Sequence, residues 1–378
     1  MPEPTSTASP QTPTSSAATA APGPRPATDH STRRLLLATL AVPLVLLLML
    51  LAFFLPSHAS SASHLPLSVS GSQQQVSTIS TALETTLPGV FDVSVEPSAE
   101  AVADAVENRA SIGGITVTDS GIEVLEASGN GSAYTTILTN LATALETRAD
   151  AAALTAAQAS GADAAALAAL QEQLSATRSV TVTDVAPLPA KDPMGVTITS
   201  LALPLVFGGM ASGAVLTIVI RAHAWKRIAA ALAIAALGSL VVVAALHAGF
   251  RTLQGDVALE WLSLALGICS ISLTLIGLHR ILGVAGLGIG AAFMVFLANP
   301  LAGIVAGPWY LPAGWGALGQ LMPVGAAGTL LRSAAYFDGA GAGASAWVLV
   351  AWCAAGLLLT ALGAGLARRQ GRAATPAV

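Results

Sequence analysis

Five ionisable side chains lie at the ends of long apolar runs, where charged groups are the first candidates for chemistry inside a membrane. His247, Asp256 and Glu260 stand at one pair of run ends, and His279 and Arg280 stand at another. A proton-driven pump needs a carboxylate at mid-membrane depth, and the run interior that follows Glu260, WLSLALGICSISLTLIGL, contains none. We therefore interpret all five as polar caps of helix ends, and the sequence disfavours proton-driven transport.

Motifs of nucleotide-binding, hydrolytic and metal sites are absent. There is no GxxxxGK[ST], HExxH, GxSxG or CxxC pattern, and the six histidines have no metal-ligand spacing. Gly286 and Gly290 form a GxxxG inside an apolar run, where small residues let helices pack closely. Cys269 and Cys353 also lie in apolar runs, and we interpret them as packing residues. We expect no enzymatic activity, cofactor, metal or nucleic-acid partner.

The composition is that of a membrane protein. Of the 378 residues 54% are hydrophobic and 10% are charged, whereas soluble domains carry about 25% charged residues. Lipid must therefore solvate much of the chain. Six apolar segments are long enough to be predicted as membrane-spanning helices, at 35–55, 196–220, 228–250, 257–278, 281–297 and 346–366. The fold class expected is a membrane α-helical protein of six transmembrane helices, with a small α/β extracytoplasmic domain inserted between helices 1 and 2.

The first residues predict a tail and an anchor. Residues 1–32 are rich in Pro, Thr, Ser and Ala and predict a disordered cytoplasmic tail. Residues 33–56 predict transmembrane helix 1, an uncleaved signal anchor. A cleaved signal peptide is the alternative, with a cleavage site in HASSAS, but signal cores run about 7–15 residues and this run is longer.

Residues 57–193 predict an extracytoplasmic α/β domain with a helical stalk. The runs LPLSVS, FDVSVE, GITVTD and VTVTDV alternate apolar and polar residues as strands do. Two helical patterns, QQVSTISTALETTLPG and SAEAVADAVENRA, separate the first three strands, so we expect a parallel βαβαβ unit. The Ala-rich stretch 132–178, broken at Ser160-Gly161, predicts a helical hairpin. Its acidic surface is interpreted as solvated, with cation binding as the alternative, and the sequon Asn130-Gly131-Ser132 as incidental.

Basic residues in the connectors predict the orientation. If the spans alternate, most of these residues fall on one side, opposite Arg251, Arg332 and an excess of Asp and Glu, and basic loops face the cytoplasm. We therefore expect a multi-pass protein of the cell (plasma or inner) membrane with both termini cytoplasmic, including the tail 368–378. The residues are Arg33, Arg34, Arg221, Lys226, Arg227, Arg280, Arg368, Arg369 and Arg372.

The five-helix membrane domain predicted at 194–367 contains an unusual link at 299–345. The link is too long and too apolar for an ordinary surface loop. Four prolines (Pro300, Pro308, Pro312 and Pro323) forbid one continuous helix. We predict short re-entrant helices in the outer leaflet, with Trp309, Tyr310 and Trp315 at headgroup level and Arg332 paired with Asp338 or with lipid phosphates. A plug that only seals the bundle is the alternative.

This link and the passage TVTDVAPLPAKDPMGVTITSLALPLVFGG into the second span resemble a known family. The pattern NPLAG…LPAGWGALGQLMPVGAAGTLLRSAAYFDGA is similar to the end of ABC-2-type transporter permeases, in particular actinobacterial membrane proteins of the YhgE/Pip (phage infection protein) group. The matching positions, none of them catalytic, are Asn299, Pro300, Leu311, Pro312, Pro323 and Arg332.

The resemblance implies a six-helix exporter-type membrane domain that dimerises, as a homo- or heterodimer, and is driven by a separate P-loop ATPase subunit. The candidate transport segment then comprises Asn299, Pro300, Leu311, Pro312, Trp315, Pro323, Arg332 and Asp338. One departure concerns the ATPase, because the family docks it through a coupling helix. Here the corresponding link is only the turn RAHAWKR, with Arg221, Trp225, Lys226 and Arg227 as candidate coupling residues.

Two functions follow as hypotheses. The first is a permease subunit that exports a hydrophobic or amphipathic compound or envelope component from the membrane lipid. The alternative is a non-transporting cell-envelope receptor or assembly scaffold that acts through its ectodomain, which the short turn favours.

Overall fold

A computed structural model describes residues 29–59, 61–118, 121–176, 180–220 and 223–373. The chain divides into two compact units, Met1–Leu50 and Leu51–Val378, which are described separately. Most of the predicted tail at 1–32 and the last five residues lie outside the described parts. Helix α1 runs from Asp29 to Ala59, so it begins four residues before the predicted span.

The described chain is mostly helical, and five of its helices are long and apolar enough to cross a membrane. This confirms the prediction of a multi-pass α-helical membrane protein. The five segments are Thr39–Pro56 of α1; Val196–Val219, which is α6 (Val196–Ala214) with a π-helical end; Ala224–Phe250, which is α7 (Ala224–Val243) with a similar end; α8 (Val257–Leu282); and Gly343–Leu366 of α12 (Gly343–Ala373).

The sixth predicted span, 281–297, is interrupted. Helix α8 ends at Leu282, and Gly283 turns the chain with φ +62°. Helix α9 (Val284–Phe293) and a π-helical turn (Met294–Ala298) then form a shorter apolar helix. At about 1.5 Å per residue it reaches about 22 Å, less than a hydrocarbon core of about 30 Å. The six-span count therefore stays a prediction.

Helix α8 is the centre of the bundle, and small residues let its neighbours approach. A Cβ at Gly277 would collide with the Gly356 carbonyl of α12. Ser272 donates a hydrogen bond to the Gly209 carbonyl of α6, at 3.1 Å. Side chains at Gly286 and Gly290 would meet Leu278 and Leu275 of α8, which confirms the packing role predicted for this GxxxG pair.

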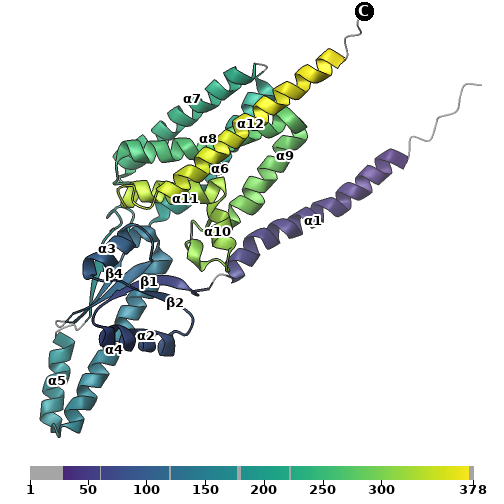
Figure 1. The fold of residues 1–378 in the computed structure, drawn as a ribbon. Helices are drawn as coiled ribbons and strands as arrows, with labels where there is room; N and C mark the ends of the chain where they lie inside the picture. The colour runs from purple at the N-terminus through teal and green to yellow at the C-terminus, as the bar shows by residue number, and fades with distance from the viewer. Residues whose placement is uncertain (1–28, 60, 119–120, 177–179, 221–222, 374–378) are drawn as a thin grey trace, which may run out of the picture. The chain divides into compact units, whose positions relative to one another are not determined.

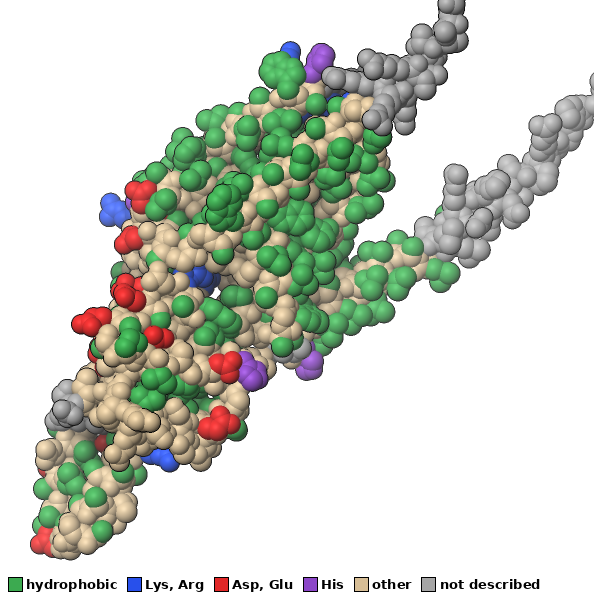
Figure 2. Space-filling view, viewed as in Figure 1, with side chains coloured by type: hydrophobic (Ala, Val, Ile, Leu, Met, Phe, Trp, Pro, Cys, Tyr) green, Lys and Arg blue, Asp and Glu red, His purple; other side chains and the backbone are tan. Residues whose placement is uncertain are grey.

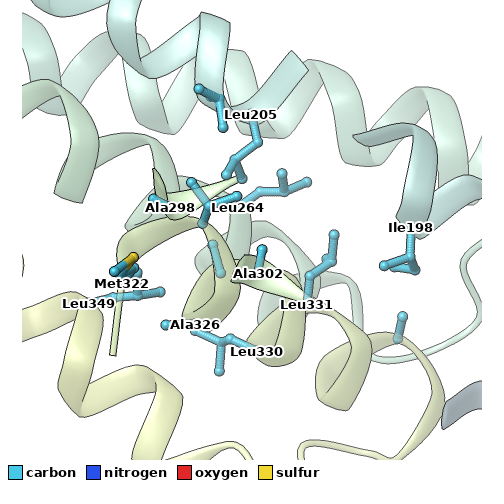
Figure 3. Packing of buried hydrophobic residues seen from close by; sticks show 14 of the residues in the cluster. Ile198, Leu205, Leu264, Ala298, Ala302, Met322, Ala326, Leu330, Leu331 and Leu349 are labelled. Carbon is cyan, nitrogen blue, oxygen red and sulfur yellow. The ribbon is translucent and has the colours of Figure 1, made fainter. Parts of the chain in front are cut away.

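The link 299–345 folds into short helices, as the prolines predicted. They are η5 (Pro300–Ala302), η6 (Pro308–Tyr310), α10 (Trp315–Gln320) and α11 (Pro323–Tyr336), and three of the four begin with proline. Proline suits the first helical position because the amide hydrogen it lacks would have no partner there. Helix α11 is buried along most of its length, and Figure 3 shows Ala326, Leu330 and Leu331 in the bundle core. This helix of the link is thus part of the interior.

A five-stranded sheet lies in residues 65–184, which we call the sheet region (Figure 1). The strands are β1 (Leu65–Ser70), β2 (Phe91–Val95), β3 (Gly113–Thr118), β4 (Gly121–Glu126) and β5 (Val180–Asp184), in the order β2-β1-β3-β4-β5. Strand β1 pairs in parallel with β2 and with β3, as expected of the predicted βαβαβ unit. The sheet as a whole is mixed, because β4 pairs antiparallel with β3 and parallel with β5.

Strand β4, GIEVLE, is absent from the sequence prediction. Its alternation is short and ends in Val124-Leu125, which are both buried. Only two residues of sequence separate it from β3, and so short a connection can join strands only as an antiparallel hairpin. The parallel unit predicted for the first three strands is thus extended by an antiparallel strand that the prediction lacks.

Three helices bury apolar faces against the sheet region's core, and two form the hairpin. Helix α2 (Gln73–Thr86) begins at a capping box of Ser72 and Gln75, and α3 (Ala99–Glu107) begins at Ser98. Helix α4 (Ser132–Ala159) packs through Tyr134, Leu138 and Leu141. It ends at the predicted break, and α5 (Ala164–Ala176) returns with no buried residue. Figure 1 shows this hairpin extending past the sheet.

Candidate functional site

The sheet region meets the 299–345 link through two arginines. Arg109 follows α3 in a left-handed conformation, with φ +59°. Its Nε donates to Asn130 Oδ1 at 3.0 Å, and its Nη1 donates to the Thr329 carbonyl at 2.9 Å and to Ser333 Oγ at 2.7 Å. Its guanidinium lies 5.4 Å from the ring centre of Phe337. The sheet region is therefore fastened to α11.

Arg332 makes the reverse connection from α11. Its Nη1 donates to the Asn130 carbonyl, and its Nη2 donates to the Ile304 carbonyl at 3.0 Å. The residue is 8% exposed and Asn130 is 2% exposed. Asn130 therefore accepts from both arginines, through its side chain and its backbone. The residue after it, Gly131, leaves room for Arg332, because a Cβ there would lie 2.8 Å from Nη1.

Asn130 is held rigidly by the short helix η1 (Ser128–Asn130). The Ser128 amide donates to Asp184 Oδ1 at 3.0 Å, and the Gly129 amide donates to the Ala186 carbonyl at 2.9 Å. These bonds tie η1 to the end of β5, so the acceptors for both arginines are preorganised by the sheet.

The two positive charges have no counterion in the described parts of the chain, where no carboxylate lies within 4 Å of Arg109 or Arg332. Their acceptors are neutral carbonyl, amide and hydroxyl oxygens. Burial lowers the pKa of Arg109 to about 9, and the charge of Arg332 contributes to that lowering. Burial likewise lowers the pKa of Arg332. Guanidinium groups are positively charged in proteins at neutral pH, and Asn130 Nδ2 beside them is a buried donor with no partner.

Two cavities are lined by one or both of these arginines, and a third, apolar cavity lies beside them and shares Ile304 with the smallest. The junction cavity has a volume of about 420 Å³ and is lined by Arg109, His64, Asn108, Trp309, Pro312 and Gln320, among others. The apolar cavity, about 500 Å³, is lined by Leu203 of α6 and by Pro300, Ile304 and Val305 of the link. Leu311 lines both. Between the arginines lies an arginine cavity of about 10 Å³, lined by Arg109, Arg332, Ile304 and Thr329.

Aromatic contacts attach the first part of the link to α4. The buried Tyr134 hydroxyl accepts a hydrogen bond from the Trp309 amide at 3.1 Å, and Tyr310 donates to the Ala133 carbonyl at 3.1 Å. Burial raises the pKa of Tyr134. Gly307, with φ +93°, allows this approach because a side chain there would collide with the Tyr134 ring. Trp309 and Tyr310 thus pack on protein.

The candidate transport residues do not all come together. Asn299, Pro300 and Leu311 line the apolar cavity, and Leu311 with Pro312 lines the junction cavity. Pro323 is buried at the start of α11, and Trp315, which begins α10, is 38% exposed. Arg332 is the member at the centre of the site.

The predicted pairing of Arg332 with Asp338 is wrong. Asp338 is exposed and follows the end of α11 with φ +50°. Arg332 lies inside the last turns of α11 and turns toward Asn130 and Ile304. The two residues are close in sequence, but the helix end separates them.

The candidate coupling residues form part of a helix. Trp225, Lys226 and Arg227 are in the first turn of α7, and Arg221 lies outside the described residues. Trp225 is 64% exposed, and Lys226 Nζ lies 5.6 Å from its ring centre. The connection between α6 and α7 is therefore even shorter than the sequence RAHAWKR indicates.

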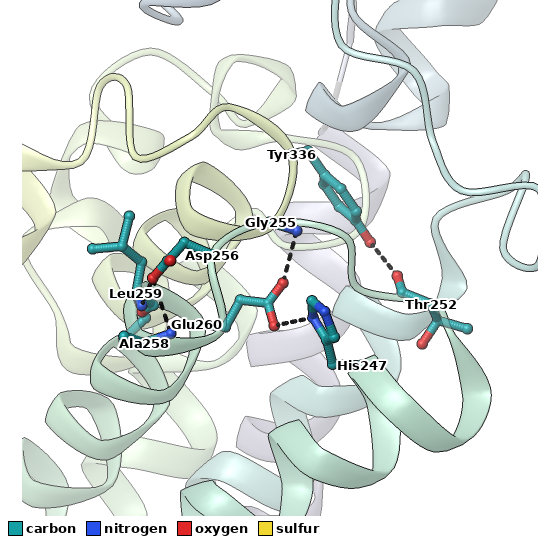
Figure 4. Close-up of polar contacts among 9 residues, drawn as sticks. His247, Thr252, Gly255, Asp256, Ala258, Leu259, Glu260 and Tyr336 are labelled. Atoms are coloured by element: carbon teal, nitrogen blue, oxygen red, sulfur yellow. Dashed lines mark hydrogen bonds and ion pairs between the residues drawn. The ribbon is translucent and has the colours of Figure 1, made fainter.

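A second polar cluster surrounds Glu260 (Figure 4). Glu260 is fully buried and accepts hydrogen bonds from the Gly255 amide and His247, both at 3.0 Å. Asp256 caps α8 through the amides of Ala258 and Leu259, as predicted for a helix end. Glu260 differs from the prediction because its carboxylate lies inside the protein, beside the 251–256 loop.

Sequence reasoning missed Arg109 and Asn130. Asn130 stands in SGNGS, where flanking glycines signal close backbone packing, and it is buried. Arg109 is the basic residue that ends the otherwise acidic helix pattern SAEAVADAVENRA. In the described part of the chain no three His, Cys, Asp or Glu side chains gather as metal ligands.

Comparison with known proteins found no match to any protein-family model, curated protein or solved structure.

Proposed function

We propose that this chain is the membrane subunit of an exporter-type transporter that moves a hydrophobic or amphipathic compound. The observation that carries this proposal is the pair of large cavities that share the wall at Leu311. One is apolar and borders a predicted span. The other carries Arg109 and amide side chains. Both volumes lie in the range of about 300–1,000 Å³ typical of small-molecule sites, and an amphipathic compound needs both kinds of lining.

The membrane architecture proposed is six spans and an ABC-2-like arrangement, working as a dimer. The short helix Val284–Ala298 serves as the fifth span, and the link 299–345 completes its path across the membrane. Irregular backbone is tolerated at membrane depth only where protein or a cavity covers it. The burial of α11 and the apolar cavity supply such cover.

The charges at the two ends of the bundle support the proposed orientation. Arg227 lies within electrostatic range of His279, and Gly363 packs against Arg280, so these basic residues share one end. Asp192, Asp256 and Glu260 belong to the other end, and Figure 2 shows Asp and Glu gathered over the sheet region and the bundle end beside it. We place the basic end and both termini in the cytoplasm, and the sheet region outside the cell membrane.

The cytoplasmic ATPase is proposed to engage the first turn of α7. Trp225 and Lys226 are exposed there, and tryptophan is a common anchor of protein interfaces. The test is ATP hydrolysis and substrate movement in liposomes that contain the purified chain and a candidate ATPase. The double variant Trp225→Ala/Lys226→Ala should lose stimulated hydrolysis, and Arg251→Ala, an exposed change at the acidic end, should not. If the wild-type chain gives neither stimulation nor movement, transport is excluded.

The α4–α5 hairpin favours a second candidate function, a non-transporting envelope receptor or scaffold. Helix α5 has no buried residue, so the hairpin offers its surface to a partner. Replacing residues 150–172 by a short Gly-Ser turn separates the two functions. A scaffold should lose partner capture, whereas a permease should keep ATPase coupling, because the junction with the link stays intact.

A further inference from the structure

Arg109 and Arg332 place two positive charges, without a counterion among the described residues, in a low-dielectric part of the protein. Removing a guanidinium from water is unfavourable unless an opposite charge compensates it. Arg109 and Arg332 have only neutral oxygens as acceptors. They also repel each other, since the charge of Arg332 acts on Arg109. A neutral side chain such as glutamine could bond the same oxygens at a lower cost.

Some hydrogen-bond donors around the arginine pair have no acceptor in the described part of the chain. Asn130 Nδ2 is buried and has no hydrogen-bond partner. Arg109 Nη2 and Arg332 Nε donate to no oxygen among the described residues. The unused N–H groups of these three nitrogen atoms and two positive charges therefore belong to one cluster, and charged N–H donors are what an anion requires.

The cavities give the size and character of the anion. The arginine cavity, about 10 Å³, has room for one water-sized atom. Its walls at Arg109, Pro308 and Thr329 are also walls of the junction cavity, which holds a much larger body. That body would contact Trp309, Leu311 and Pro312, which are mainly apolar, besides Gln320. A ligand that fits both cavities would place one oxygen of an oxyanion between the arginines and the rest of the molecule in the junction cavity.

We infer that Arg109 and Arg332 form a binding site for the phosphate or carboxylate group of an amphipathic molecule that enters through the junction cavity. The site supplies the counterion that the chain lacks. This inference concerns binding alone and goes beyond the proposed function, because a receptor would use the same site without transport.

The test uses the full chain in phosphatidylcholine nanodiscs at constant ionic strength. Inorganic phosphate is titrated in one arm, and phosphatidylglycerol replaces part of the lipid in the other. Thermal unfolding and equilibrium dialysis of labelled phosphate are the measurements. We expect at least one arm to raise Tm by about 3 °C or more, because a ligand of the native state stabilises it. A response to phosphate alone identifies a free oxyanion, and a response to phosphatidylglycerol alone identifies a lipid headgroup.

Three variants complete the test. Arg109→Gln should weaken binding at least about tenfold, and Arg148→Gln, which changes an exposed arginine on α4, should leave it unchanged. Asn130→Asp places a carboxylate beside both guanidinium groups. It should raise Tm without added anion and abolish the response to either probe, so it remains informative if Arg109→Gln fails to fold. The inference is overturned if neither probe stabilises the wild type, or if Asn130→Asp responds as the wild type does.

Discussion

Two polar clusters lie near Tyr336, and they differ in what balances their charge. Tyr336 is within electrostatic range of both Glu260 and Arg332. Glu260 is surrounded by donors of its own chain, His247 and the Gly255 amide. Arg332 and Arg109 have only neutral acceptors, and a donor beside them is unused. The Glu260 carboxylate has its hydrogen-bond donors within the chain, although Thr252 Oγ1 in the neighbouring 251–256 loop has no partner among the described residues. The arginine pair, in contrast, has its charge balanced only by an added anion.

The largest effect is expected from removing the carboxylate of Glu260. Glu260→Ala leaves the Gly255 amide and the His247 ring without their acceptor in a buried place. An unsatisfied buried donor costs about 1–3 kcal/mol, so the free energy of unfolding should fall by about 2–4 kcal/mol. Denaturant unfolding in detergent measures it. The surface control Glu84→Ala on α2 should change stability by less than about 0.5 kcal/mol. Equal effects of the two variants would contradict the structural role of Glu260.

An effect of opposite sign is expected at the arginine pair, Arg109 and Arg332. Asn130→Asp should stabilise the anion-free protein by about 1–3 kcal/mol, because charge-assisted hydrogen bonds are worth about that amount. Two guanidinium groups lower the folded-state pKa of the new carboxyl below its unfolded value of about 4. The gain should therefore be present above pH 5 and lost as the pH falls through the lowered pKa. Unfolding followed from pH 7 to pH 3 checks this, and a gain of the same size at pH 3 as at pH 7 would refute the charge explanation.

The stability of the wild type should depend on alkaline pH because of Arg109. The pKa of Arg109 is lowered from its ordinary value of 12.5 to about 9 in the folded state. Above pH 9 the unfolded chain therefore binds more protons, and the contribution of Arg109 to stability rises with pH. Unfolding midpoints from pH 8 to 10 should show this rise in the wild type and not in Arg109→Gln. Bound phosphate should flatten it, since an anion restores the pKa.

The smallest effect is expected at Asp338. Asp338→Asn should leave the free energy of unfolding within about 0.5 kcal/mol of the wild type, because the side chain is exposed and Arg332 lies elsewhere. Asparagine also tolerates the positive φ of this position. Thermal unfolding measures the difference. A loss of more than about 1 kcal/mol would revive the pairing of Asp338 with Arg332.

The sequence by itself determined the features that depend on neighbouring residues. Apolar runs of sufficient length predicted the membrane helices, period-two alternation predicted four of the five strands, and Ser160-Gly161 marked the break in the hairpin. The prolines of 299–345 predicted short helices because a missing amide hydrogen acts within one helical turn. Each of these signals is local, so no partner element had to be known.

Only the tertiary structure decided which charges are buried and what balances them. Glu260 and Asp256 look alike at the start of one apolar run, yet the first is buried beside His247 and the second caps the helix. Arg109, Asn130 and Arg332 come from distant parts of the sequence. Arg109, for example, donates a hydrogen bond to Ser333, which lies 224 residues further along the chain. Desolvation of a charge depends on every element packed around it, and no periodicity in the sequence records that packing.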